Sequence, residues 1–115
     1  MKPFNNLVNI ARRKNHFDQT NPWANGSSTY IEEIQKEIQE VIEEIPQNRK
    51  VYLEDELADV LWDYLNLVLA LEKETEIELE SVLKRASRKY EERISGIDFK
   101  VRGWKNHHWE RVELR

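Results

Sequence analysis

The sequence predicts an all-α protein, and three observations lead to that fold class. Apolar residues recur every three or four positions in four separate stretches, which is the spacing of one face of an α-helix. Only three Gly and three Pro occur in 115 residues, too few for the many tight turns of an all-β domain. A hydrophobic content of 39% beside a charged content of 35% is typical of a folded helical chain rather than a disordered one. We therefore expect a bundle of about four helices.

The first expected helix is short and belongs to an N-terminal arm, residues 1–20. Its apolar positions are Phe4, Leu7, Val8 and Ala11. It ends in the basic run 12–14, and the polar segment 15–29 follows. Asn-Pro at 21–22 and Asn-Gly at 25–26 predict turns in that segment.

The second helix is expected to begin where Ser28 or Thr29 can cap it and to end near Ile45, because Pro46 follows. One face of this helix is apolar. It consists of Ile31, Ile34, Ile38, Val41, Ile42 and Ile45.

The third helix, about residues 53–71, is apolar on nearly every side and is therefore expected at the centre of the assembly. Three or four helices from one chain can hardly cover such a helix. We therefore expect a homo-oligomer, a dimer or a tetramer, that completes the bundle.

The fourth helix is expected over about residues 77–94, with Gly96 as its C-terminal stop. A tail rich in aromatic and basic residues follows. The expected organisation is thus an arm (1–20), a catalytic helical domain (21–97) and a C-terminal tail (98–115).

Composition excludes several classes of site. The chain has no Cys, which rules out disulfides, thiolate metal sites and cysteine nucleophiles and favours the reducing cytoplasm. The apolar stretch 53–71 carries carboxylates, which are costly in lipid, so we expect no membrane span. Sixteen acidic residues against four basic ones lie between Glu32 and Glu80, while both flanks are net basic. This pattern differs from the uniformly basic face of a duplex-DNA binder.

A narrow polar line runs along the third helix. Its members, Glu56, Asp59, Asp63 and Asn66, lie within about 80° of one another around the helix axis. Buried carboxylates need cations, hydrogen-bond donors or metal ions near them. The alternative is that the line faces solvent or pairs with Lys and Arg of a neighbouring helix.

A second acidic band lies on the preceding helix, at Glu33, Glu37, Glu40 and Glu44. Glu37 is the closest of these to the apolar face. If the two helices pack antiparallel through the short connection 46–52, the acidic lines converge. All-oxygen ligation suits Mg²⁺ or Mn²⁺. A di-iron bundle would need Glu-x-x-His pairs, which the sequence lacks.

The pairing of "KEIQEV" (36–41) with "DELADVL" (55–61) resembles the MazG-type all-α nucleoside triphosphate pyrophosphohydrolases, whose signature is E-E-x-x-E followed by E-x-x-D. The resemblance implies that Glu37, Glu40, Glu56 and Asp59 bind metal and form the catalytic centre. Lys36 stands at the signature's first acidic position, so the acidic doublet is incomplete. Glu33 is a candidate to compensate, and a lower metal count is the alternative.

The resemblance extends to the flanks, through "NPW" (21–23) and "RKYEERI" (88–94). It implies that Lys89 and Arg93 bind phosphates, although ordinary surface cations have the same spacing. Trp23 can stack on a base or simply pack against the protein. Asp63 and Asn66 either contact the sugar or base edge of a nucleotide or bond a buried neighbour.

The implied reaction is attack of water on the α-phosphorus of a nucleoside or deoxynucleoside triphosphate, giving monophosphate and pyrophosphate, as in house-cleaning of the nucleotide pool. Glu40 or a neighbouring free carboxylate is the expected general base. One alternative is a non-catalytic acidic adaptor or oligomerisation module. Another is a single-strand nucleic-acid binder that uses Trp104 and Trp109; the acidic centre disfavours it. His107 and His108 are expected to be exposed tail residues rather than ligands.

Overall fold

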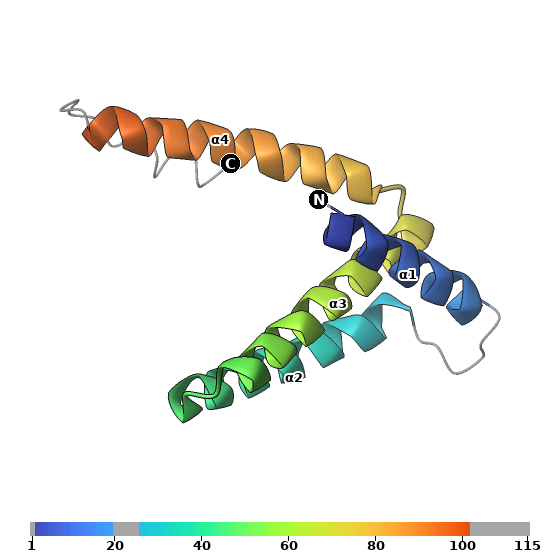
Figure 1. The fold of residues 1–115 in the computed structure, drawn as a ribbon. Coiled ribbons are helices and arrows are strands. Elements are labelled where there is room, and N and C mark those ends of the chain that lie inside the picture. The colour runs from blue at the N-terminus through green and yellow to red at the C-terminus, as the bar shows by residue number, and fades with distance from the viewer. Residues whose placement is uncertain (1, 20–25, 102–115) are drawn as a thin grey trace. The chain divides into compact units, whose positions relative to one another are not determined.

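The structure is a computed structural model that describes residues 2–19 and 26–101, and these residues form four α-helices and no strand (Figure 1). The all-α prediction is confirmed. The helices are α1 (Lys2–Gln19), α2 (Ser27–Glu44), α3 (Lys50–Glu74) and α4 (Leu79–Val101), with a 3-10 turn, η1 (Ile45–Gln47), after α2. The chain divides into two units, Met1–Glu78 with α1 to α3 and Leu79–Arg115 with α4. No described helix combines the length and apolar character needed to cross a membrane.

The helices α2 and α3 form an antiparallel hairpin (Figure 1). Pro46 lies at the start of η1 and cannot continue the α2 hydrogen-bond ladder. Asn48 then takes a left-handed conformation with φ 60°, which Asn tolerates better than most residues. Arg49 caps α3 and forms two hydrogen bonds with the Glu44 carboxylate, at 2.8 and 3.0 Å. The short connection therefore folds the chain back sharply.

The core of this unit lies along the C-terminal half of α3. Leu65 and Leu69 are each only 1% exposed, and Val68 and Ala70 are also buried. Ala11 of α1, which packs against α3, has no exposed surface. Arg12 binds Glu72 at 3.1 Å across the same contact, and Lys73 donates to the Asn15 carbonyl at 3.3 Å. The extra length of α3 beyond α2 thus provides the surface on which α1 lies.

Polar contacts also join the start of α2 to its neighbours. The Tyr30 hydroxyl lies 2.6 Å from Asp18 and 2.8 Å from Lys14, both on α1. The backbone N–H of Ser27 donates to Glu74 of α3 at 2.8 Å, and the Ser27 hydroxyl binds the same carboxylate. A carboxylate at a helix N-terminus satisfies free backbone donors and interacts favourably with the helix dipole.

Several predicted helix boundaries were wrong. The helix α1 continues to Gln19, five residues into the segment predicted as a loop, supported by the Lys14–Asp18 pair one turn apart. Gly26, rather than Ser28 or Thr29, caps α2. Gly96 does not stop α4, which runs on to Val101, because a single glycine weakens a helix without ending it.

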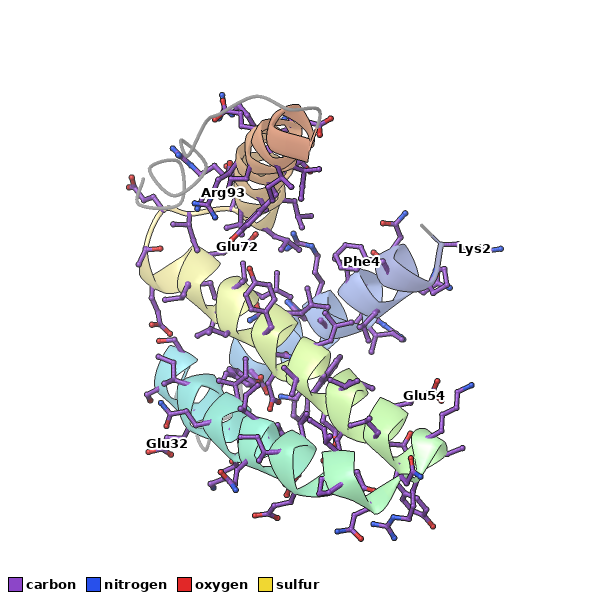
Figure 2. All side chains as sticks on the ribbon, turned by 90° about the vertical axis from the view of Figure 1, so that its left-hand side faces the viewer. Lys2, Phe4, Glu32, Glu54, Glu72 and Arg93 are labelled. Atoms are coloured by element: carbon purple, nitrogen blue, oxygen red, sulfur yellow. The ribbon has the colours of Figure 1, made fainter. Side chains whose placement is uncertain are left out.

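Many apolar side chains of the α2–α3 hairpin remain exposed within the single chain. Ile38 and Ile42 of α2 are 46% and 55% exposed, and Leu57 and Leu61 of α3 are 51% and 40% exposed. Charged residues occupy the outer side of the hairpin, where the exposed Glu32 and Glu54 point away from the contact between the helices (Figure 2). The apolar face predicted for α2 is thus only partly covered by the described residues of its own unit.

Candidate functional site

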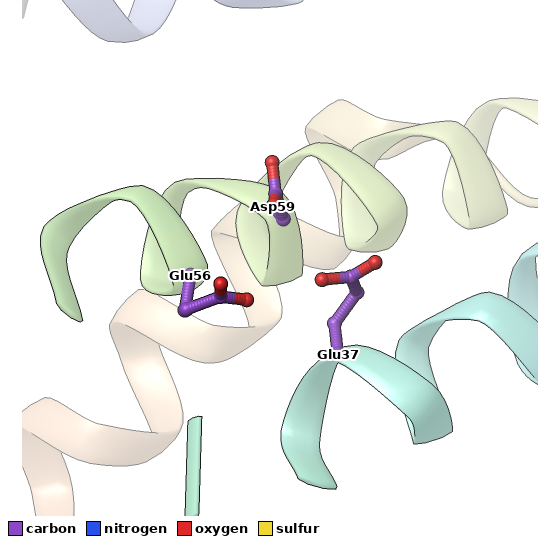
Figure 3. Close-up of side chains that lie close together, drawn as sticks. All are labelled: Glu37, Glu56 and Asp59. Carbon is purple, nitrogen blue, oxygen red and sulfur yellow. The ribbon is translucent and has the colours of Figure 1, made fainter. Parts of the chain in front are cut away.

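Three carboxylates converge where α2 and α3 face each other. Glu37 reaches from α2 toward Glu56 and Asp59 on α3 (Figure 3). One oxygen from each residue lies within 4.8 Å of the others. Glu56 and Asp59 are three residues apart, and this spacing places them side by side on one helix face. The antiparallel return of α3 brings that face to Glu37.

Two of the oxygens in this group are buried and have no hydrogen-bond donor. They are Oε2 of Glu37 and Oε2 of Glu56. The Asp59 side chain is exposed, so the group is open on one side. Among the described residues, no cationic side chain pairs with any of the three. A buried carboxylate oxygen without a donor or a cation is costly, so this arrangement calls for a positive ligand.

Glu40, one turn after Glu37 on α2, adds to the charge of the group. Burial, together with hydrogen bonding to the Glu40 carboxyl and the nearby charges, raises the pKa of Glu37 to about 7. Hydrogen bonding to Glu40, followed by burial and the charge of Asp59, raises the pKa of Glu56. Both shifts fit carboxyl groups that are shielded from water and lie beside other carboxyls without a compensating cation.

The donor set fits a hard divalent cation. It consists only of carboxylate oxygens, the ligands that Mg²⁺ and Mn²⁺ prefer. The close approach of the three oxygens and their lack of protein donors fit an ion placed among them. Glu37, Glu56 and Asp59 would hold that ion, and Glu40 lies close enough to Glu37 and Glu56 to share hydrogen bonds with them.

Comparison with known proteins gives a family match over this same region. A sequence model of the MazG nucleotide pyrophosphohydrolase domain matches residues 25–96. The chain belongs to the MazG family. The matched region holds all of α2 and α3 and most of α4, and it includes the three converging carboxylates. Searches of curated proteins and of solved structures found no significant match to the chain.

The polar line of the MazG domain continues beyond Asp59 into the buried half of α3. Asp63 is 7% exposed and Asn66 is 0% exposed. The Asn66 amide nitrogen donates to the Trp62 carbonyl at 2.9 Å, whereas Asn66 Oδ1 and Asp63 Oδ2 are buried without a donor. Burial and the charges of Glu33 and Asp59 raise the pKa of Asp63. These side chains do not face solvent, which was one of the alternatives for the polar line.

The remaining acids of the α2 band have cationic partners. Glu33 pairs with the exposed Lys36 at 3.4 Å, and Glu44 pairs with Arg49 at 2.8 Å. Lys36, at the MazG signature's first acidic position, therefore contacts Glu33 on its own helix. The Glu33 charge nevertheless acts on Asp63.

The other predicted binding residues include Lys89, Arg93 and Trp23. Lys89 and Arg93 are one turn apart on α4, in the second unit, and their charged groups lie 5.9 and 4.7 Å from the centre of the Tyr90 ring. Arg93 is 7% exposed, and the phosphate-binding role of Lys89 and Arg93 stays a prediction. Trp23 falls outside the described residues, as do the tail residues Trp104, His107, His108 and Trp109.

Proposed function

We propose that this MazG-family protein hydrolyses nucleoside or deoxynucleoside triphosphates to the monophosphate and pyrophosphate, with Mg²⁺ or alternatively Mn²⁺ bound by Glu37, Glu40, Glu56 and Asp59. The observation that carries the proposal is the convergence of carboxylate oxygens within 4.8 Å, two of them from residues with buried, donor-free oxygens. House-cleaning of the cytoplasmic nucleotide pool is the proposed role.

The proposed mechanism assigns separate tasks to the acidic residues. A bound divalent ion would neutralise phosphate charge and lower the pKa of water. Glu37, Glu56 and Asp59 fix the position of the positive charge between α2 and α3. The base that takes the proton of the attacking water is proposed to be Glu40, through an oxygen that the ion does not use, or a neighbouring free carboxylate. Glu40 suits this task because its side chain is exposed and contacts Glu37 and Glu56.

Substrate binding is proposed to involve residues beyond the acidic group itself. Lys89 and Arg93 would bind the β- and γ-phosphates, since guanidinium and ammonium groups form strong charge-assisted bonds to phosphate oxygens. Trp23 would stack on the base. Asp63 and Asn66, one and two turns beyond Asp59 on α3, would contact the nucleoside.

The proposal is tested by pyrophosphate release from the common nucleotides in Mg²⁺, with Glu56→Gln and Asp59→Asn beside the wild type. Each variant removes one charge without changing side-chain size, and we expect a fall of about 100-fold or more in kcat/KM because several kcal/mol of charge stabilisation are lost. Glu54→Gln is the matched control, since Glu54 points outward from the same helix (Figure 2). Undiminished release by both site variants would exclude this catalytic group.

A non-catalytic adaptor is the second candidate function, favoured by the exposed apolar side chains of α2 and α3. The two functions differ in their response to metal. A functional ion site should raise the melting temperature in millimolar Mg²⁺ or Mn²⁺ relative to EDTA, because a ligand that binds only the folded state stabilises it. An unchanged melting temperature, together with no pyrophosphate release, would favour the adaptor.

A further inference from the structure

Asp63 and Asn66 place two buried hydrogen-bond acceptors next to the carboxylate group. Asp63 Oδ2 and Asn66 Oδ1 have no donor, and the two side chains are 7% and 0% exposed. Such acceptors are uncommon in native proteins and require an explanation. Since the residues are three apart on α3, their side chains lie next to each other on one face.

The position of this pair matches the expected extent of a bound nucleotide. Asp63 and Asn66 follow Asp59 by about 6 Å and about 10 Å along the α3 axis, at 1.5 Å per residue. Both lie on the same side of the helix as Asp59, and the charge of Asp63 contributes to raising the pKa of Glu37. If phosphates bind at the carboxylate group, the nucleoside extending along α3 toward the core reaches Asp63 and Asn66.

The pair offers acceptors rather than donors. The amide nitrogen of Asn66 is already used, because it donates to the Trp62 carbonyl at 2.9 Å. Only Oδ1 of that side chain is left, beside Oδ2 of Asp63. The nearby charge of Glu33 further favours a group with partial positive charge. An amino group attached to an aromatic ring meets these requirements, because it carries two N–H donors.

We propose that Asp63 and Asn66 form a base-recognition subsite that accepts the exocyclic amino group of cytosine or adenine and rejects the carbonyl that replaces it in uracil or hypoxanthine. This assignment rests on the proposed nucleotide hydrolysis. A carbonyl oxygen at that position would add a third acceptor against the two shielded ones, and the single N–H of the neighbouring ring nitrogen could satisfy at most one of them. Each unmatched buried acceptor is costly, so we expect discrimination of about 10- to 100-fold.

The test uses nucleotide pairs that differ at this group and at the adjacent ring nitrogen, which is an acceptor in the amino member and carries N–H in the keto member. Isothermal titration calorimetry with non-hydrolysable α,β-methylene analogues of dCTP and dUTP, and of ATP and ITP, measures base preference without turnover. We expect the amino member of at least one pair to bind about 10-fold or more tightly than its keto partner. Equal affinities, or preference for the keto member, in both pairs would overturn the inference. Pyrophosphate release by the wild type is measured separately, so failure of the proposed reaction is distinguishable from failure of this subsite.

Two variants test whether the preference for the amino base depends on Asp63 and Asn66. Asp63→Asn introduces an amide donor, and Asn66→Leu removes an acceptor while keeping the number of side-chain heavy atoms. Each variant should shrink the amino-to-keto affinity ratio at least threefold. Asp55→Asn, the same substitution at an exposed position near the start of α3, should leave the ratio unchanged. Circular dichroism checks that the variants stay helical. A wild-type ratio that persists in both folded variants would also overturn the assignment.

Discussion

Glu37 is the residue whose ionisation is most altered by the fold. Its pKa rises from an ordinary 4.5 to about 7 because of burial and the neighbouring carboxyls of Glu40, Asp59 and Asp63. Between these two pH values the unfolded chain loses its proton while the folded chain keeps it. The folded state therefore binds more protons, and the free energy of unfolding falls as pH rises through this window.

The metal-free protein should accordingly have a lower melting temperature at pH 8 than at pH 5.5. Glu37→Gln should flatten this pH dependence, since the amide does not ionise. Asp18 and Glu74, whose pKa values are lowered by their hydrogen bonds, titrate below this window and should not interfere. Differential scanning calorimetry in EDTA measures the effect. A pH slope that is identical in wild type and Glu37→Gln would show that Glu37 does not titrate as described.

Helical periodicity and the short connection after α2 were enough to predict that the acidic lines of the two helices would converge, because they fix the helix face and the direction of return. The MazG resemblance then singled out Glu37, Glu56 and Asp59 within these lines. The structure brings these three together, while the catalytic roles of Glu37, Glu40, Glu56 and Asp59 stay predictions. The hydrogen bonds among Tyr30, Asp18 and Lys14 could not be predicted. They join different helices, and no local pattern signals such a contact.

At the scale of single elements, the start of α2 depends on Gly26. Its φ of +65° lies in a region that side chains rarely adopt, and a Cβ atom there would meet the Glu74 carboxylate. That carboxylate in turn binds Ser27 at the helix N-terminus. Gly26 thus allows α2 to begin directly against α3.

Gly26→Ala should therefore destabilise the protein by about 1–3 kcal/mol, because backbone strain is added and the Glu74 contact is displaced. Chemical denaturation followed by circular dichroism measures this change. Gly96→Ala is the control, since Gly96 lies within α4, where alanine is favoured over glycine by about 0.5–1 kcal/mol. If Gly26→Ala stabilises the chain as Gly96→Ala does, the proposed backbone strain at position 26 is contradicted.

The existence and order of the four helices could be predicted from apolar spacing, whereas their ends could not. The segment 15–29 contains residues that favour turns, yet α1 extends to Gln19. Contacts made in the folded unit, such as that of Lys73 with the Asn15 carbonyl, stabilise this extension. Tertiary packing here outweighs weak local preferences.

At the scale of the whole molecule, the exposed apolar side chains of α2 and α3 support the expected homo-oligomer. Soluble monomers rarely leave extended apolar patches uncovered. Light scattering coupled to size-exclusion chromatography should give a mass of at least twice the 13.9 kDa chain. Ile42→Lys and Leu57→Lys, at positions 55% and 51% exposed, should shift the mass toward one chain because burying a lysine charge at an interface is costly.

Gln35→Lys, at an exposed polar position of α2, serves as the control and should keep the wild-type mass. A wild-type protein that elutes with the mass of one chain at micromolar concentration would contradict the oligomer. The sequence alone indicated that one chain cannot bury all the apolar residues of α3. It could not indicate which surface of a second chain packs against them.

The length of the turn between α2 and α3 limits which insertions and deletions the protein can tolerate, although no residue of the turn belongs to the acidic group. Adding or deleting one amino acid within residues 45–49, with the backbones of the turn and of α3 kept in place, would shift the α3 sequence by one position. That shift would rotate its side chains by about 100° about the helix axis and carry Glu56 and Asp59 away from Glu37. Indels at this turn should thus be far less tolerated than substitutions, even though the turn contributes no ligand. The length of this turn should therefore be under the same selection as the acidic residues, because it determines whether their side chains meet.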